Sequence, residues 1–238
     1  MKRLTGGIRL LVAALFTVGV AITAIMGNLF DRRRGRVFFW LARRWACGVL
    51  TICGLRLTVR GEDLLDSSSH YVYVSNHASL FDIPVLTAAV PTNFRIVYKK
   101  ELEKIPIFGW NLKWGPYIAI DRSNKVDALR SVEEAAQKIH NGDSVLLYAE
   151  GTRTEDGRLQ PFKRGAFNLA VKSGVPVVPV SINGTFHIMA KGSLAIRPGP
   201  VEVTFDSPIE VNSHGGRDEE IRVMEQVHLA IAKNYRNQ

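Results

Sequence analysis

HYVYVSNHASLFDIPVLTAA, residues 70–89, is the stretch that decides the fold of this chain. Residues 70–75 are mostly apolar or aromatic, which predicts a buried strand, and residues 83–89, with Pro84 in the first turn, predict a helix. The segment between them is the connecting loop. A strand that leads through a short loop into a helix is the unit from which α/β folds are built.

The same alternation continues on both sides of this stretch. We expect further strands at residues 55–60, 94–98, 117–121, 144–148 and 177–182, and helices at residues 124–140, 162–172 and 218–235. Residues 194–197 and 201–205, on either side of Pro198-Gly199-Pro200, predict a hairpin. The sequence therefore predicts the α/β class, with a mixed, largely parallel sheet flanked by helices.

The positive charge of the chain is concentrated at its amino-terminal end. Residues 1–60 hold 11 of the 31 Lys and Arg residues but only one of the 22 acidic residues. These basic residues flank an uncharged run, residues 10–30, an arrangement that attracts anionic lipid headgroups, whereas a DNA-binding protein places them among base-contacting polar residues. We therefore expect a membrane-associated helical segment over residues 1–54, a catalytic α/β domain over residues 55–238, and no nucleic-acid partner.

The uncharged run is compatible with three kinds of segment. Its 21 residues suffice for one bilayer span, which needs about 20 helical residues. Residues 37–52 form a second, amphipathic segment, so two helices that lie in one leaflet compete with a single span. A cleaved signal peptide is the third alternative, and the charged residues 31–36 after the run argue against it. Because the larger Arg cluster follows the run, we expect the rest of the chain on the cytoplasmic face of the inner (plasma) membrane.

The segment Asn76-His77-Ala78-Ser79-Leu80-Phe81-Asp82 contains a base and a carboxylate. On a continuous helix, His77 and Asp82 would lie about 140° apart and out of contact. If His77 lies in the loop and Asp82 begins the next helix, the loop brings the imidazole onto the carboxylate. The carboxylate then orients the ring and leaves its other nitrogen free to accept a proton from an alcohol. A helix cap at Asp82 with His77 in a plain turn is the alternative.

A second segment, Glu150-Gly151-Thr152-Arg153, follows the predicted strand 144–148. It therefore lies at the carboxyl end of a strand, where ligand sites of open α/β sheets gather. Gly151 permits close backbone approach, Thr152 adds a hydroxyl donor, and Arg153 offers a planar fork that matches phosphate oxygens. An exposed turn with an ion pair between Glu150 and Arg153 is the alternative. We expect His77 and Arg153 to line one pocket beside the lipid surface.

The residues between these segments add weaker candidates. The ammonium of Lys100 would neutralise oxyanion charge or assist phosphate binding, unless it belongs to a solvated charge run. Arg122 follows a predicted strand and is another candidate phosphate contact. The stretch around Phe108, Trp110 and Trp114 would line an acyl groove or pack in the core.

Together these residues resemble the glycerolipid acyltransferases of the 1-acylglycerol-3-phosphate acyltransferase type. The resemblance covers residues 70–185 and rests on ordered blocks: Asn-His-x4-Asp at 76–82, Lys-Lys-Glu-Leu followed by Pro-x-Phe-Gly-Trp at 99–110, Ile-Asp-Arg at 120–122, Glu-Gly-Thr-Arg at 150–153 and Val-Pro-Val-Val-Pro-Val at 175–180. It implies that His77 is the base and Asp82 its partner, that residues 150–153 bind the acceptor phosphate, and that an amino-terminal two-helix element lies at the membrane. The family usually has Phe-Pro before Glu-Gly-Thr-Arg, whereas this chain has Tyr148-Ala149 and so lacks the fixed φ angle of proline.

The sequence thus predicts an acyltransferase that moves a fatty acyl group from an acyl carrier protein or coenzyme A thioester to the sn-2 hydroxyl of lysophosphatidic acid, giving phosphatidic acid. Because a thiol is a good leaving group, we expect neither a metal nor another cofactor, and the thioester is itself a substrate. The expected partners are membrane lipids, lysophosphatidic acid, and acyl carrier protein or acyl coenzyme A. Three alternatives stay open: the same chemistry on another lysophospholipid or a lyso-aminolipid, metal-dependent phosphoester hydrolysis, and lipid binding without catalysis.

Overall fold

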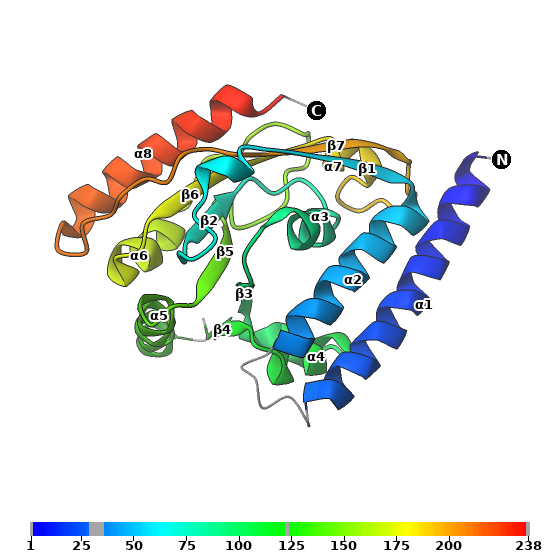
Figure 1. The fold of residues 1–238 in the computed structure, drawn as a ribbon, viewed down its shortest axis with the longest axis horizontal. Coiled ribbons are helices and arrows are strands. Elements are labelled where there is room, and N and C mark those ends of the chain that lie inside the picture. Colours follow the sequence, from blue (N-terminus) through cyan, green and yellow to red (C-terminus); the bar gives the residue numbers. More distant parts are fainter. Residues whose placement is uncertain (1, 29–35, 122–123, 237–238) are drawn as a thin grey trace.

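A seven-stranded mixed sheet organises the protein, whose computed structural model describes residues 2–28, 36–121 and 124–236 (Figure 1). The strand order is β1-β7-β6-β2-β5-β3-β4. Neighbouring strands are parallel except for β6 and β7, which are antiparallel. The strands are β1 (Leu55–Arg60), β2 (Val72–Ser75), β3 (Phe94–Lys99), β4 (Ile118–Ile120), β5 (Ser144–Tyr148), β6 (Val177–Asn183) and β7 (Gly199–Phe205). The predicted α/β class with a mixed, largely parallel sheet is confirmed.

The helices predicted in the catalytic part lie close to their predicted positions, with ends shifted by one or two residues, whereas the short helices Phe108–Trp114 and Thr185–Ile188 were not predicted. Side-chain capping explains the start of α5, because Oδ1 of Asn124 accepts the N–H of Asp127 (2.9 Å). The helices are α1 (Lys2–Asn28), α2 (Arg36–Cys53), α3 (Asp82–Ala89), α4 (Phe108–Trp114), α5 (Lys125–His140), α6 (Arg164–Ser173), α7 (Thr185–Ile188) and α8 (Gly216–Asn234), with 3-10 turns η1 (Glu62–Leu64) and η2 (Lys100–Lys104).

The predicted hairpin of residues 194–197 and 201–205 is wrong. Only the second half forms a strand, β7, which lies between β1 and β6 in the sheet. Both edges of β7 are therefore already paired, and residues 194–197 have no strand edge to join. They run as a loop instead, in which the N–H of Arg197 donates to the carbonyl of Ile188 (2.9 Å).

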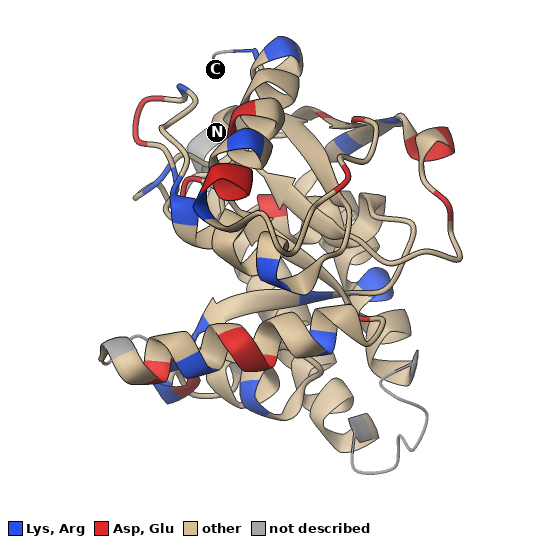
Figure 2. Ribbon diagram, turned by 90° about the vertical axis from the view of Figure 1, so that its left-hand side faces the viewer, with Lys and Arg blue, Asp and Glu red and all other residues tan. Residues whose placement is uncertain are grey.

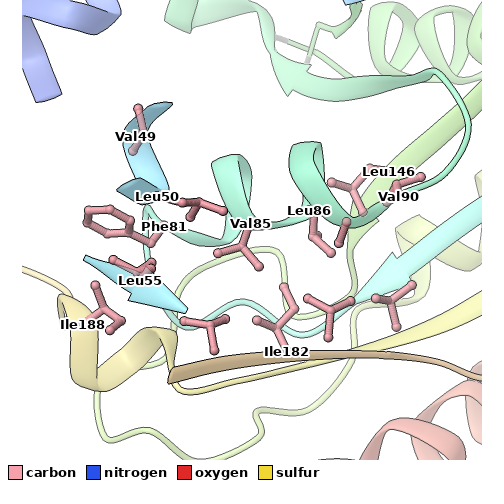
Figure 3. Packing of buried hydrophobic residues seen from close by; sticks show 14 of the residues in the cluster. Val49, Leu50, Leu55, Phe81, Val85, Leu86, Val90, Leu146, Ile182 and Ile188 are labelled. Carbon is pink, nitrogen blue, oxygen red and sulfur yellow. The ribbon is translucent and has the colours of Figure 1, made fainter. Parts of the chain in front are cut away.

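Alternate residues of the central strands supply two cores on opposite faces of the sheet. Tyr73 of β2 belongs to the core beneath α2 and α3, whereas its neighbour Val72 belongs to the core beneath α5, α6 and α8. Figure 3 shows Val85 and Leu86 of α3 between that helix and the strands, close to Ile182. Because β2 is buried on both faces, the loop that follows it starts from a firmly packed strand.

The two amino-terminal helices pack against each other along one side of the molecule (Figure 1). Gly48 of α2 allows close approach, since a Cβ there would lie 2.5 Å from the ring of Phe16 in α1. Nε1 of Trp45 donates to Oγ1 of Thr17 across the same contact (2.9 Å). β1 starts two residues after α2 ends, at the predicted boundary, while the division into two domains stays a prediction.

The charged residues are distributed differently on the two sides of the molecule. Figure 2 shows Lys and Arg interspersed with Asp and Glu on the face formed by α5, α6 and α8, as is typical of a water-exposed surface. α1 instead contains an apolar stretch, Gly6–Gly27, with one basic residue, Arg9, and no acidic residue. The stretch has 22 residues, an 18-residue window within it has a mean hydropathy of 2.4, and it is long and apolar enough to cross a membrane.

Candidate active site

Parallel pairing of β2 with β5 brings the two motifs together. Ser75, the last residue of β2, is paired with Tyr148, the last residue of β5. The loops that follow both strands therefore leave the sheet side by side at its carboxyl edge, where ligand sites of such sheets form. The N–H of Ala149 donates to the carbonyl of Ser75 (3.0 Å) and continues the pairing into the loops. Two segments that are distant in the sequence thus share one site.

The imidazole of His77 is held by the carboxylate of Asp82. Nδ1 of His77 lies 2.8 Å from Oδ2 of Asp82, and the same oxygen accepts the N–H groups of Ala78 (2.7 Å) and Ser79 (2.9 Å). Asp82 is the first residue of α3 and is fully buried. With Nδ1 donating, Nε2 is the acceptor nitrogen, and it has no hydrogen-bond partner in the described parts of the chain. The predicted contact is confirmed, while the catalytic role of the two residues stays a prediction.

Buried polar side chains fix the loop around the histidine. The Asn76 amide donates to the carbonyl of Ile182 (3.0 Å) and accepts its N–H (2.8 Å), which ties the loop to β6. The hydroxyl of Ser79 donates to the carbonyl of Met189 (2.7 Å) and that of Ser75 to the carbonyl of Asn76 (2.9 Å). Both serines are buried and engaged, so neither is placed as a nucleophile. Sequence reasoning assigned no function to Asn76, although its place beside the histidine was a signal.

The side chain of Glu150 holds the backbone of the first motif and does not face a substrate. Its carboxylate is buried, Oε1 accepts the N–H of His77 (2.6 Å), and Oε2 accepts the N–H of Gln160 (3.0 Å). Burial raises the pKa of Glu150 to about 7, although both N–H groups act in the opposite direction. Because both oxygens are occupied, the structure does not bring Glu150 to the predicted phosphate site. The ion pair between Glu150 and Arg153 is not formed either.

The residues before and after Glu150 also restrain the histidine. The Tyr148 ring stacks on the His77 ring, with centroids 3.9 Å apart and planes at 15°. The N–H of Thr154 donates to the carbonyl of His77 (2.9 Å). The tyrosine that replaces the usual phenylalanine therefore retains the flat ring that this stacking needs. The second motif and the residues beside it thus hold both the backbone and the side chain of His77.

Three of the four residues of the second motif open into the same cavity as His77. Gly151, Thr152 and Arg153 line it together with the imidazole, as does Lys163, the residue before α6. Arg153 is half-buried and has no ion-pair partner among the described residues. The predicted shared pocket of His77 and Arg153 is therefore present.

The weaker candidates are not brought to this cavity. Lys100 is exposed and its Nζ pairs with Asp121 (2.8 Å), so its charge is already compensated on the surface. Arg122 lies outside the described residues. Trp110 and Trp114 are about half exposed and do not line the cavity. Among the described residues, no group of three or more His, Cys, Asp or Glu side chains is arranged to hold a metal ion.

The cavity has a volume of about 1100 Å³ and extends from the motifs to the amino-terminal helices. Its wall away from the motifs is mostly apolar and combines side chains of α1, α2, α3, α4, α6 and β5, among them Val18, Ala21, Ala24, Phe38, Ala42, Ile83, Leu112, Leu147 and Leu169. A polar end with a base and cationic side chains and a long apolar wall suit an amphiphile with a charged head and a hydrocarbon chain.

Comparison with known proteins gives consistent matches. The Acyltransferase family model matches residues 56–183. The 1-acyl-sn-glycerol-3-phosphate acyltransferase BAT2, chloroplastic, of Brassica napus is 37% identical over 217 residues, which are 87% of this chain and 62% of the relative. The human 1-acyl-sn-glycerol-3-phosphate acyltransferase alpha is 34% identical over 196 residues, which are 82% of this chain and 67% of the relative.

A solved structure extends the similarity to nearly the whole chain. The crystal structure of the 1-acyl-sn-glycerophosphate acyltransferase PlsC from Thermotoga maritima matches with a TM-score of 0.84 and 26% identity, over 99% of this chain and 96% of that chain. The curated plant relatives are longer, and the chain spans about 56% of the one from Cocos nucifera, to which it is 34% identical.

Proposed function

The chain belongs to the acyltransferase family, and we propose that it moves a fatty acyl group from an acyl thioester to the sn-2 hydroxyl of lysophosphatidic acid, giving phosphatidic acid. The observation that carries the proposal is the His77–Asp82 pair, which opens with Arg153 into one largely apolar cavity. The names of the relatives and of the similar solved structure support the same acceptor.

The geometry of His77 suits a general base. Nδ1 is held by Asp82, and Nε2 faces no other described hydrogen-bond partner. In the proposed step, Nε2 takes the proton of the acceptor hydroxyl as its oxygen attacks the thioester carbonyl carbon. The carbon–sulfur bond then breaks, and the thiolate takes the proton from the imidazolium. The reaction needs no cofactor, and the same chemistry applies to thioesters of acyl carrier protein and of coenzyme A.

The acyl chain and the oxyanion need separate surroundings. The apolar wall of the cavity provides space for the chain, and Arg153 provides a fork for the acceptor phosphate. Lys100, the candidate from the sequence for neutralising the oxyanion, is held by Asp121 outside the cavity wall. A backbone N–H of the loops is therefore the better candidate.

Membrane association is the second part of the proposal. Apolar side chains of α1 lie largely exposed in the protein, and the clearest examples are Ile8, Leu11, Leu15, Ile22 and Met26, which are 48–65% exposed. Such a surface is typical of a lipid-facing helix. We expect α1 and α2 to contact membrane lipids, with the catalytic domain on the cytoplasmic face of the inner (plasma) membrane.

Product analysis tests the reaction directly. The purified full chain in detergent is offered a mixture of lysophosphatidic acid, other lysophospholipids and a lyso-aminolipid, with acyl carrier protein and coenzyme A thioesters in separate reactions. Mass spectrometry identifies the acylated product. We expect phosphatidic acid as the main product, whereas acylation of another lysolipid in its place would overturn the proposed acceptor.

The role of His77 is tested by substitution. His77→Ala removes the proposed base, and we expect transfer to fall about 10² to 10⁴-fold with the fold unchanged by circular dichroism. His214→Ala is the matched control, because His214 is exposed and does not line the cavity. Near wild-type transfer by a folded His77→Ala variant would contradict the proposal.

A further inference from the structure

Lys163 is a cation of the cavity to which the sequence motifs assign no function. It immediately precedes α6 and lines the cavity together with Gly151, Thr152 and Arg153. Its N–H donates to the carbonyl of Ala149 (2.7 Å), which fixes the residue beside the second motif. Within the described parts of the chain, the ammonium has no hydrogen-bond or ion-pair partner. It is therefore available to a ligand in the cavity.

The Lys163 side chain crosses directly over Gly151. A Cβ built on Gly151 would lie 2.9 Å from Cδ and 3.4 Å from Nζ of Lys163. Gly151 also has a φ of 67°, a conformation that other residues rarely adopt. The glycine thus turns the backbone and leaves the space through which the ammonium reaches the loop that carries Arg153.

The cation next to Lys163 in the chain is already compensated, whereas Arg153 and Lys163 are not compensated by any described residue. Arg164, the next residue after Lys163, pairs with Glu220 at 3.2 Å. Arg153 and Lys163 line one cavity without an acidic partner in the residues that the structure describes. Two like charges that face one space repel each other, and an anion bound between them relieves the repulsion.

We propose that Lys163 is the second phosphate ligand of the acceptor site, and that Arg153 and Lys163 together select acceptors with a terminal phosphomonoester. This inference rests on the proposed function. A phosphomonoester carries a charge of about −1.5 to −2 at pH 7, so a single guanidinium leaves part of it uncompensated. The ammonium supplies the second positive charge. A phosphodiester lysolipid carries one negative charge at its phosphate and gains less from the pair.

The test compares two acceptors in the full-length protein. Lys163→Met keeps most of the length of the side chain and removes its charge. At a fixed concentration of one acyl thioester, we expect the KM for lysophosphatidic acid to rise about 10- to 100-fold, as for loss of a hydrogen bond to a charged group. We expect the KM for the thioester to stay unchanged. The KM for lysophosphatidylglycerol, a phosphodiester, should change less. The preference for lysophosphatidic acid over lysophosphatidylglycerol should therefore fall.

Two further variants separate charge from structure. Lys163→Arg retains the charge, and we expect it to keep most of the preference for lysophosphatidic acid. Lys191→Met removes an exposed ammonium that pairs with Glu155 at 2.7 Å, and we expect wild-type kinetics. Thermal unfolding of each variant in detergent checks the fold. An unchanged preference in Lys163→Met, or loss of preference in Lys163→Arg equal to that in Lys163→Met, would overturn the inference.

Equilibrium binding of lysophosphatidic acid without a thioester distinguishes this inference from the proposed function. If the wild-type protein forms no phosphatidic acid, the proposed function fails. Weaker binding by Lys163→Met than by the wild type would still support the phosphate contact. Equal binding by the two proteins would overturn it, whatever the turnover.

Discussion

Two carboxylates in the site have different tasks because their surroundings differ. Asp82 contacts the imidazole of His77, whereas Glu150 contacts only backbone N–H groups, those of His77 and Gln160. The first orients the ring, and the second holds the loop that carries it. Glu150 is thus a positioning residue, and we expect its loss to affect the proposed catalysis by displacing His77.

The buried Glu150 makes stability depend on pH. Its pKa is about 7 in the folded protein against an ordinary value of 4.5. The folded state therefore binds more protons than the unfolded state between these values, and the free energy of unfolding decreases as pH rises through this range. Glu150→Gln removes the titration and leaves one acceptor for two N–H groups. We expect the variant to be less stable than the wild type at pH 5, with a difference that shrinks toward pH 8.

Urea unfolding in detergent over this pH range measures the difference. Glu101→Gln replaces an exposed carboxylate and serves as the control, which should follow the wild type at each pH. A stability difference for Glu150→Gln that does not vary between pH 5 and 8 would show that Glu150 has no raised pKa.

At the scale of the elements, α4 extends the apolar surface of α1. Nδ2 of Asn111 in α4 donates to the carbonyl of Ala21 in α1 (3.3 Å), so the two helices lie against each other. Trp110 and Trp114 are one turn apart on α4, 47% and 54% exposed, with ring centroids 6.2 Å apart. Tryptophan is enriched at membrane–water interfaces, because its ring is amphipathic. We therefore expect α4 to contact the same lipid surface that we propose for α1.

Replacing both tryptophans tests this contact. We expect Trp110→Ala/Trp114→Ala to bind vesicles of anionic phospholipid roughly tenfold or more weakly in a cosedimentation assay, because the lost apolar area no longer leaves water. Leu194→Ala/Leu229→Ala removes two exposed apolar side chains elsewhere, 76% and 69% exposed, and should bind as the wild type does. Undiminished binding by the tryptophan variant would assign the membrane contact to the amino-terminal helices alone.

At the scale of the whole molecule, one cavity extends from the amino-terminal helices to His77 and Arg153. Its wall includes side chains of α1 and α2 as well as the loops after β2 and β5. The amino-terminal helices therefore do more than provide an apolar outer surface, since they complete the wall of the cavity that we propose to hold a hydrocarbon chain. Removal of these helices would open that space to solvent.

Filling the cavity should change which acyl chains are transferred. Ala24 of α1 is 4% exposed and lines the cavity wall. Ala24→Phe places a ring in that space. Each methylene of an acyl chain that the ring excludes from the cavity loses about 0.8 kcal/mol of favourable burial free energy. We expect the preferred acyl chain to become shorter when thioesters of several lengths compete, with products identified by mass spectrometry. Ala232→Phe on the exposed side of α8 is the control, and an unchanged product profile for Ala24→Phe would contradict this use of the cavity.

The order of most strands and helices and the contact between His77 and Asp82 could be predicted from the sequence. Apolar periodicity, capping residues and loop length act over a few neighbouring residues, so the local pattern contains the necessary information. The predicted helix α5 and strand β5 show this clearly, because their observed ends agree with the pattern to within one residue.

The pairing of distant segments was decided by the tertiary structure. β7 pairs with β1 and β6 instead of forming a hairpin, and Lys99 and Lys163 line the cavity whereas the predicted Lys100 does not. Glu150 likewise faces backbone N–H groups because β5 lies next to β2. Strand register and the direction of a charged side chain depend on packing between residues far apart in the chain, and no local pattern contains that information.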